Sequence, residues 1–131
     1  MIYTGREVSE FIAVPYETLM RWARQGLLNP EGGGRQRVKT YWHAKDVREA
    51  SILTALRKAG LPLQKLTGVV AYLRTVGHNL LSSGEFLLVR ARTGEPRDIV
   101  KFCTTREAIS LLRKDTQGYL LFRLWSPPAK E

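Results

Sequence analysis

Apolar residues recur at helical spacing along most of the first eighty positions, with breaks at proline and glycine. A capping-box pattern, Thr4 followed by Glu7, predicts the start of a short first helix. Pro15 stands where a second helix begins, at its first position, and Gly26 stands just past its end. Two short helices joined by a turn of about three or four residues are the skeleton of a helix-turn-helix. The pattern therefore predicts this unit over residues 4–26.

A basic, glycine-rich stretch follows and precedes two longer apolar-periodic segments. Residues 31–42 read as a glycine-tipped loop that leads into a short strand, as the wing of a winged helix-turn-helix does. Three cations alternate there along one side of an extended chain: Arg35, Arg37 and Lys39. Further helices are predicted over about residues 44–59 and 62–81. The apolar stripe of the last one favours residues 73–81 as a surface for a partner.

The second half changes from helical to strand periodicity after Ser83-Gly84. It predicts a β-β-α-β unit, with strands over residues 85–92, 98–103 and 119–125 and a helix over residues 104–114. Such a unit can cover its sheet on one face only. Its final strand is unusually apolar for an edge, so it is either central in the sheet or pairs with another chain. The fold class is therefore α+β, divided into residues 1–81 and 84–126.

The net charge of the chain indicates which class of partner it favours. The 131 residues hold 21 Lys and Arg against 12 Asp and Glu, which gives a net charge of +9, and the basic excess leans toward the first half. A basic surface favours polyanions, because each neutralised phosphate releases a condensed counterion. The single cysteine excludes an internal disulfide. With no long apolar run and no secretory signal, we expect a cytoplasmic protein without a membrane partner.

Residues 18–28, Thr-Leu-Met-Arg-Trp-Ala-Arg-Gln-Gly-Leu-Leu, carry a resemblance to a known family. Together with Asp46-Val47 and Leu56-Arg57-Lys58-Ala59-Gly60, they resemble the mercury-resistance-regulator (MerR) family of winged helix-turn-helix transcription factors. The resemblance covers about residues 3–74. It implies a homodimer that regulates transcription by binding a near-palindromic site in double-stranded DNA, with the second helix in the major groove.

Carried over by position, the resemblance places the DNA contacts on three segments. The second helix would face base edges or phosphates, the wing would touch the DNA backbone, and the amides that begin the first helix would add a helix-dipole contact. The predicted DNA-binding residues are Thr4, Tyr16, Glu17, Thr18, Arg21, Arg24, Arg35, Arg37 and Lys39.

The chain departs from the family pattern at several places. Met20 stands where the family has a phosphate-binding arginine. Ala13 replaces the glycine of the turn, a change that requires its backbone to keep a negative φ. The second half differs from the effector region of the family, so no effector chemistry is implied. We expect residues 84–126 to form the dimer interface and to offer a surface for a protein partner.

Other classes of function find less support in the sequence. His43, His78 and Cys103 lie too far apart for a metal site, and no catalytic arrangement or cofactor motif stands out, so neither an enzyme nor a cofactor is expected. Two alternatives stay open. One is an antitoxin, with a DNA-binding first half and a toxin-binding second half. The other is an architectural protein that serves mainly to bend DNA.

Overall fold

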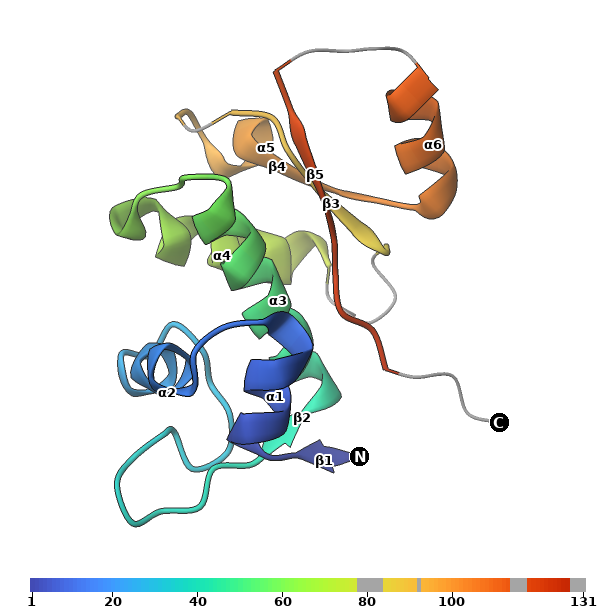
Figure 1. The fold of residues 1–131 in the computed structure, drawn as a ribbon. Coiled ribbons are helices and arrows are strands. Elements are labelled where there is room, and N and C mark those ends of the chain that lie inside the picture. The colour runs from blue at the N-terminus through green and yellow to red at the C-terminus, as the bar shows by residue number, and fades with distance from the viewer. Residues whose placement is uncertain (78–83, 92, 114–117, 128–131) are drawn as a thin grey trace.

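In the computed structural model of the protein, residues 1–77, 84–91, 93–113 and 118–127 are described. Figure 1 shows the N-terminal helices at one end of the molecule and a three-stranded sheet at the other, with α3 between them. This arrangement confirms the predicted α+β class. In chain order the elements are β1 (Ile2–Tyr3), α1 (Gly5–Ile12), α2 (Tyr16–Arg24), β2 (Trp42–His43), α3 (Ala44–Lys58), α4 (Leu63–Val76), β3 (Phe86–Val89), α5 (Pro96–Ile99), β4 (Val100–Cys103), α6 (Thr105–Arg113) and β5 (Leu120–Arg123).

The helix-turn-helix forms as the local signals predict. The hydroxyl of Thr4 accepts a hydrogen bond from the Glu7 N–H at 3.2 Å, and the Thr4 N–H donates to the Glu7 carboxylate at 3.0 Å. The capping box is therefore present at the start of α1. Pro15 caps α2 rather than occupying its first position, so the helix begins one residue later than predicted. Gly26 follows the end of α2 with a φ of +79°.

The turn between α1 and α2 contradicts the expectation for Ala13. Its backbone has a φ of 54° and a ψ of 47°, which is the left-handed region rather than the negative φ expected. The Ala13 N–H bonds to the last carbonyls of α1, and the Val14 N–H bonds to the Ser9 carbonyl at 3.1 Å. These bonds hold the turn in the shape that a glycine would adopt without strain.

Replacing Ala13 with glycine should therefore stabilise the protein. A left-handed alanine costs about 1–2 kcal/mol, and the extra backbone freedom of glycine in the unfolded chain offsets about 0.5–1 kcal/mol of the gain. We expect Ala13→Gly to raise the free energy of unfolding by up to about 1 kcal/mol in urea denaturation. As a control, Ala71→Gly on the exposed side of α4 should lower it by about 1 kcal/mol. Equal destabilisation by both changes would contradict the strain at Ala13.

α3 is the central element of the molecule. Every residue from 46 to 56 is buried, because α3 contacts α1, α4, β2 and β3. The helix is therefore covered on all sides, as a helix in the middle of a core must be. β2 precedes it and pairs with β1 in a two-stranded sheet, in which Trp42 is fully buried opposite Tyr3.

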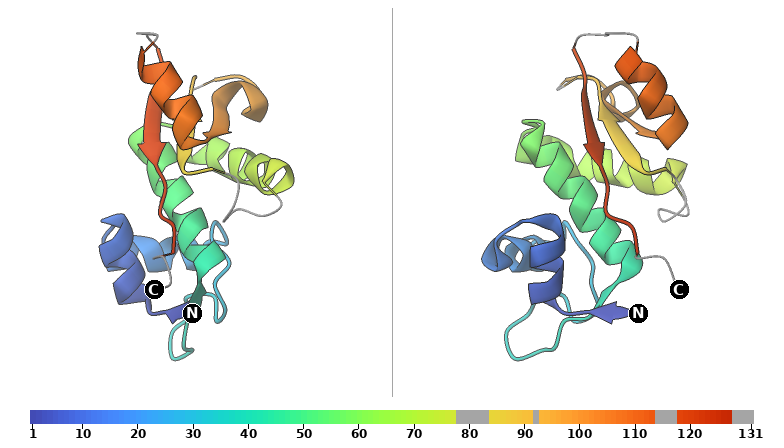
Figure 2. Two further views of the ribbon diagram at one scale, coloured as in Figure 1. Left: turned by 90° about the vertical axis from the view of Figure 1, so that its right-hand side faces the viewer. Right: turned by 45° about the vertical axis from the view of Figure 1, so that its right-hand side comes forward.

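The sheet of the second half has the order β4-β3-β5, and both outer strands run antiparallel to β3. Leu87 and Val89 belong to the core cluster that includes α3 and α4. Leu88 and Cys103 are also buried but lie on the opposite face, where α6 packs (Figure 2). α6 of the second half covers one face of this sheet, and α3 and α4 of the first half cover the other. The division into residues 1–81 and 84–126 stays a prediction.

Three further details bear on the sequence-based picture. β5 is an edge strand, because β3 occupies the centre of the sheet, and this excludes the first of the two alternatives for the final strand. α4 ends at Val76, and the expected continuation to residue 81 falls largely outside the described residues. Leu73, offered as a surface for a partner, is buried within the chain, whereas Val76 is half exposed.

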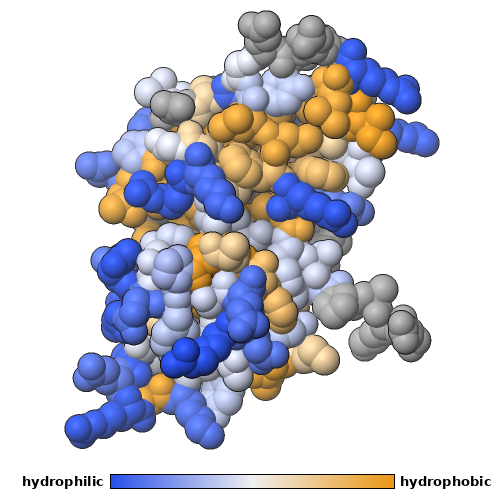
Figure 3. Space-filling view, in the orientation of Figure 1, coloured by the Kyte–Doolittle hydropathy of each residue, from blue (hydrophilic) through white to orange (hydrophobic). Residues whose placement is uncertain are grey.

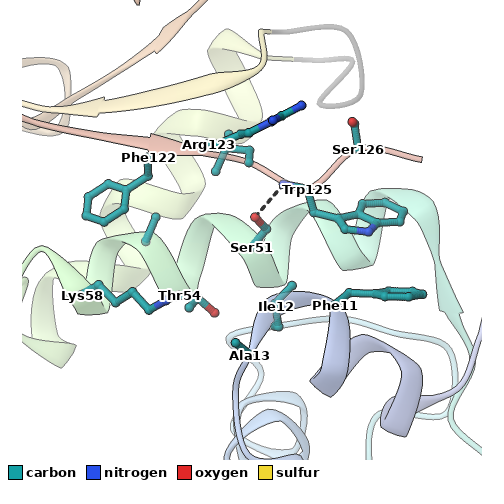
Figure 4. A pocket seen from close by; sticks show the side chains of 12 residues that line it. Phe11, Ile12, Ala13, Ser51, Thr54, Lys58, Phe122, Arg123, Trp125 and Ser126 are labelled. Carbon is teal, nitrogen blue, oxygen red and sulfur yellow. Dashed lines mark hydrogen bonds between the residues drawn. The ribbon is translucent and has the colours of Figure 1, made fainter. Parts of the chain in front are cut away.

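The segment after β5 connects the sheet to α1 and α3 through hydrogen bonds and ring contacts of Trp125 (Figure 4). The Trp125 N–H donates to the Ser51 hydroxyl at 2.9 Å, and the Trp125 carbonyl accepts from Arg48 at 2.8 Å. The Trp125 ring stacks on Phe11 with 5.9 Å between ring centroids and meets Tyr3 edge-on at 5.5 Å. Trp125, just after the C-terminal strand, therefore contacts α1, α3 and β1.

Candidate nucleic-acid interface

One face of α2 is exposed and charged, and the other is buried. Leu19 and Trp22 pack into the core together with Met20 and Ala23. Glu17, Arg21 and Arg24 are exposed, and their spacing of four and three residues places them on one face of the helix. Trp22 is thus a core residue, and Met20, which is 8% exposed, lies at the edge of the core. The outward face of α2 offers two guanidinium groups to solvent.

The loop after α2, residues 32–40, is closed at its base and pressed against α2. Glu31 and Tyr41 exchange two backbone hydrogen bonds, of 3.1 and 2.7 Å. Gly34 has a φ of +72°, and a Cβ there would come within 3.0 Å of the Ala23 side chain and of the Met20 carbonyl. Glycine is therefore required at this position both for its conformation and for its close approach to α2. We call residues 32–40 the wing loop.

The wing loop leads into a short strand as predicted, but it is not extended from Arg35 to Lys39. Arg37 has a φ of +64°, and the Val38 N–H donates to the Arg35 carbonyl at 3.3 Å, which makes a turn. The strand proper is confined to Trp42–His43. The expected alternation of Arg35, Arg37 and Lys39 along one side of an extended chain is therefore wrong. All three side chains are nevertheless exposed.

A groove of about 770 Å³ separates the wing loop from the starts of α1 and α2. It brings together seven of the nine predicted residues, namely Thr4, Tyr16, Glu17, Arg24, Arg35, Arg37 and Lys39. Thr18 and Arg21 do not line it. Arg21 lies on the adjoining outer face of α2, and Thr18 is half-buried at the flank of that helix. Hydrophilic side chains dominate this end of the molecule in Figure 3.

The groove carries five cationic side chains and one carboxylate among its lining residues. Glu17 contacts Arg24 with 3.8 Å between the closest oxygen and nitrogen, and both side chains are largely exposed. Such an exposed pair is weak, so Arg24 remains available to an anion. The groove is therefore an electropositive cleft, flanked by helices and a glycine-rich loop.

Arg6 is a residue of the groove that the sequence reasoning missed. Its guanidinium carbon lies 4.8 Å from the centre of the Tyr16 ring, in a cation–π contact between α1 and α2. Arg6 also lines the groove beside Thr4. One signal in the sequence could have identified Arg6. It stands in the first turn of the first helix, where the free amide groups already suggested a phosphate contact.

The remaining candidate groups lie away from this groove or serve the fold. Cys103 is buried, and burial raises the pKa of its thiol, with the Glu107 carboxylate acting in the same direction. It therefore packs as a small apolar group in its protonated form. Among the described residues, no group of three or more His, Cys, Asp or Glu is placed to hold a metal ion. None of the described helices is both long and apolar enough to cross a bilayer.

Comparison with known proteins gives a family match and a likeness to solved structures. Residues 3–73, more than half of the chain, match the MerR HTH family of regulatory proteins. None of the curated proteins matches the chain. Among solved structures, the chain is similar to HiNmlR, described as a MerR family regulator lacking the sensor domain, in a crystal structure bound to promoter DNA. The identity is 24%, the match covers 57% of this chain and 56% of that chain, and the TM-score is 0.49.

Proposed function

This chain belongs to the MerR family of helix-turn-helix regulatory proteins, and from this premise we propose that it binds a specific site in double-stranded DNA to control transcription. The outward face of α2 would enter the major groove, where Arg21 and Arg24 read base edges or clamp phosphates. The wing loop and the start of α1 would hold the adjacent sugar-phosphate backbone. The observation that carries the proposal is the cationic groove between α2 and the wing loop.

Two features of the groove support a fit to duplex DNA. Its cations lie on both walls, so a phosphate backbone seated between them meets positive charge from α1, from α2 and from the wing loop. The first turn of α1, from Thr4 to Arg6, also lines the same space, at the positive end of the helix dipole. A single carboxylate, Glu17, is compatible with a contact to the amino group of cytosine.

We further propose that the protein binds as a homodimer to a near-palindromic site. A single winged unit reads too few base pairs for high specificity, and a two-fold dimer solves this by reading two half-sites. Selection from a pool of random duplexes tests this directly. Enrichment of an inverted repeat is the expected result, whereas uniform weak binding to every sequence would contradict the proposal.

Replacing Arg21 distinguishes a contact to DNA bases from a contact to the phosphate backbone. We expect Arg21→Ala to weaken binding to the selected site by about 1–3 kcal/mol and to relax the base preference at one position of each half-site. Arg97→Ala, in which an exposed arginine of the second half is removed, is the matched control for the lost charge. Competition binding with single-base variants of the site measures both effects. Equal weakening on all sequences would show that Arg21 touches phosphate only.

A second candidate function is an antitoxin, whose second half would bind a toxin. Exposed apolar side chains on α6, Ile109 at 47% and Leu112 at 69%, favour some protein partner in this region. The test is to co-express the protein with the product of a small gene that neighbours its own. Co-purification of the two proteins in a fixed ratio would support this function. The DNA-binding groove would serve either function in the same way.

A further inference from the structure

The second half leaves one edge of its sheet open. Among the described residues, β5 pairs only with β3, so its outer side has no strand partner. Leu124 N–H donates to the Glu85 carbonyl at 2.9 Å, and this bond fixes which backbone groups face β3. Because backbone groups alternate in direction along an antiparallel strand, those of Leu120 and Phe122 face β3 and those of Leu121 and Arg123 face outward.

The residue after β5 bears out this alternation. Trp125 continues the outward series, and both of its backbone groups are satisfied by α3, through the Ser51 hydroxyl and the Arg48 guanidinium. α3 therefore closes the lower end of this edge. The N–H and C=O groups of Leu121 and Arg123 are left facing outward, ready to pair with another strand.

The surface beside this edge is apolar in a strongly basic protein. Ile109 and Leu112 are both exposed, and they lie on the flank of α6 opposite to the one that lines a pocket with Lys101 of β4. Figure 3 shows apolar surface gathered over α6 and the neighbouring sheet, at the end of the molecule away from the groove. Depletion of charge next to exposed apolar side chains is typical of the centre of an interface.

We propose that β5 pairs antiparallel with β5 of a second copy of this chain, so that two sheets join into one of six strands across a two-fold axis. This inference names the interface of the dimer proposed above and rests on that dimer. A two-fold interface must be complementary to itself. Arg123 is the single charge in β5, and pairing Phe122 with Phe122 of the second copy sets each Arg123 opposite a Leu121 instead of another arginine.

The other edge of the sheet is a poorer candidate. β4 carries the exposed Lys101, and Arg90 and Arg106 line the same side of the sheet. Cations along an edge strand are a usual device against pairing. A second copy brought to β4 would meet these charges with its own, whereas the β5 edge places no like charges opposite each other. An acidic partner would favour the β4 edge, whereas the β5 edge, with Arg123 as its single charge, fits a copy of itself.

Leu121→Pro tests the pairing through a single N–H group. Proline removes an outward donor that takes no part in the ladder with β3, so the fold should persist. In sedimentation of the full chain without DNA, we expect a wild-type dimer and a Leu121→Pro monomer that still unfolds cooperatively. Leu121→Ala keeps the N–H and should remain mostly dimeric. A wild-type monomer, or a folded Leu121→Pro variant that remains dimeric, would overturn the inference.

A second pair of variants decides the question even if the proline variant does not fold. Leu112→Glu places a charge on the α6 flank and should raise the dimer dissociation constant about tenfold or more, because the carboxylate would be buried at the interface. Val76→Glu adds the same charge at a half-exposed apolar position of α4, near the β4 side, and should leave the dimer intact. The reverse result would place the interface elsewhere. Since no DNA is present, failure here leaves the DNA-binding groove untouched.

Discussion

Replacing Arg48 with alanine should lower the free energy of unfolding by about 3–5 kcal/mol. Arg48 is 1% exposed in the middle of α3, and its guanidinium donates to the carbonyls of Trp125 and Gly84. Its loss leaves both acceptors without their charged donor and removes the packing of a long aliphatic stem. Burial lowers the pKa of Arg48, because it removes water from the charged guanidinium, and the Glu85 carboxylate acts in the opposite direction.

Two substitutions separate the parts of this effect. Arg48→Met restores most of the stem but none of the donors, and we expect it to recover less than half of the lost stability in urea denaturation. Arg57→Ala, at an exposed position near the end of the same helix, should have a much smaller effect, although it removes one hydrogen bond to the Leu61 carbonyl. Wild-type stability of Arg48→Met would show that the two hydrogen bonds contribute nothing net.

Arg48 also illustrates what the sequence does not reveal. A charged residue in the middle of a helix usually belongs to a solvated face, and no local pattern marks this one as buried. Its partner Trp125 lies 77 positions away, so the pairing exists only once α3 and the C-terminal strand have packed together. The cover of the sheet by α3 and α4 escaped prediction for the same reason, because no periodicity states which helix will face which sheet.

Local chemistry, in contrast, was readable. The predicted capping box at Thr4 involves residues only three positions apart. The same pair of bonds recurs between Thr104 and Glu107, each at 3.2 Å. Two of the sequence-based errors in the N-terminal half are backbone conformations. Ala13 and Arg37 both have positive φ, which residues other than glycine rarely adopt and which accompanies local backbone hydrogen bonds here.

The groove was predicted in composition but not in shape. Most of its cations were identified because they stand in a helix-turn-helix and in a basic glycine-rich loop. The turn at Arg37 and the contact of Arg6 with Tyr16 depend on how the wing loop and α1 pack beside α2. The identity of the charged residues is therefore a property of the sequence, whereas their convergence on one cleft is a property of the fold.

Removing the three wing-loop cations together should produce the largest loss of DNA binding. If Arg35, Arg37 and Lys39 each neutralise one phosphate, their replacement by alanine lowers the slope of log K against log salt by about 2.7 in magnitude, at roughly 0.9 per phosphate. At about 0.1 M salt this corresponds to a roughly 100- to 1000-fold weaker affinity. Because phosphates carry no base identity, specific and nonspecific duplexes should lose affinity alike.

The matched control removes three exposed cations from the second half, Arg97, Arg106 and Arg113, and leaves the same net charge. Long-range attraction depends on net charge, so it falls equally in both triple variants, whereas counterion release falls only where a cation touches phosphate. Binding isotherms from about 50 to 200 mM salt distinguish the two effects. Equal slopes for the two triple variants would mean that the wing loop does not touch the DNA, and the groove beside α2 would then lose its role as the seat of the phosphate backbone.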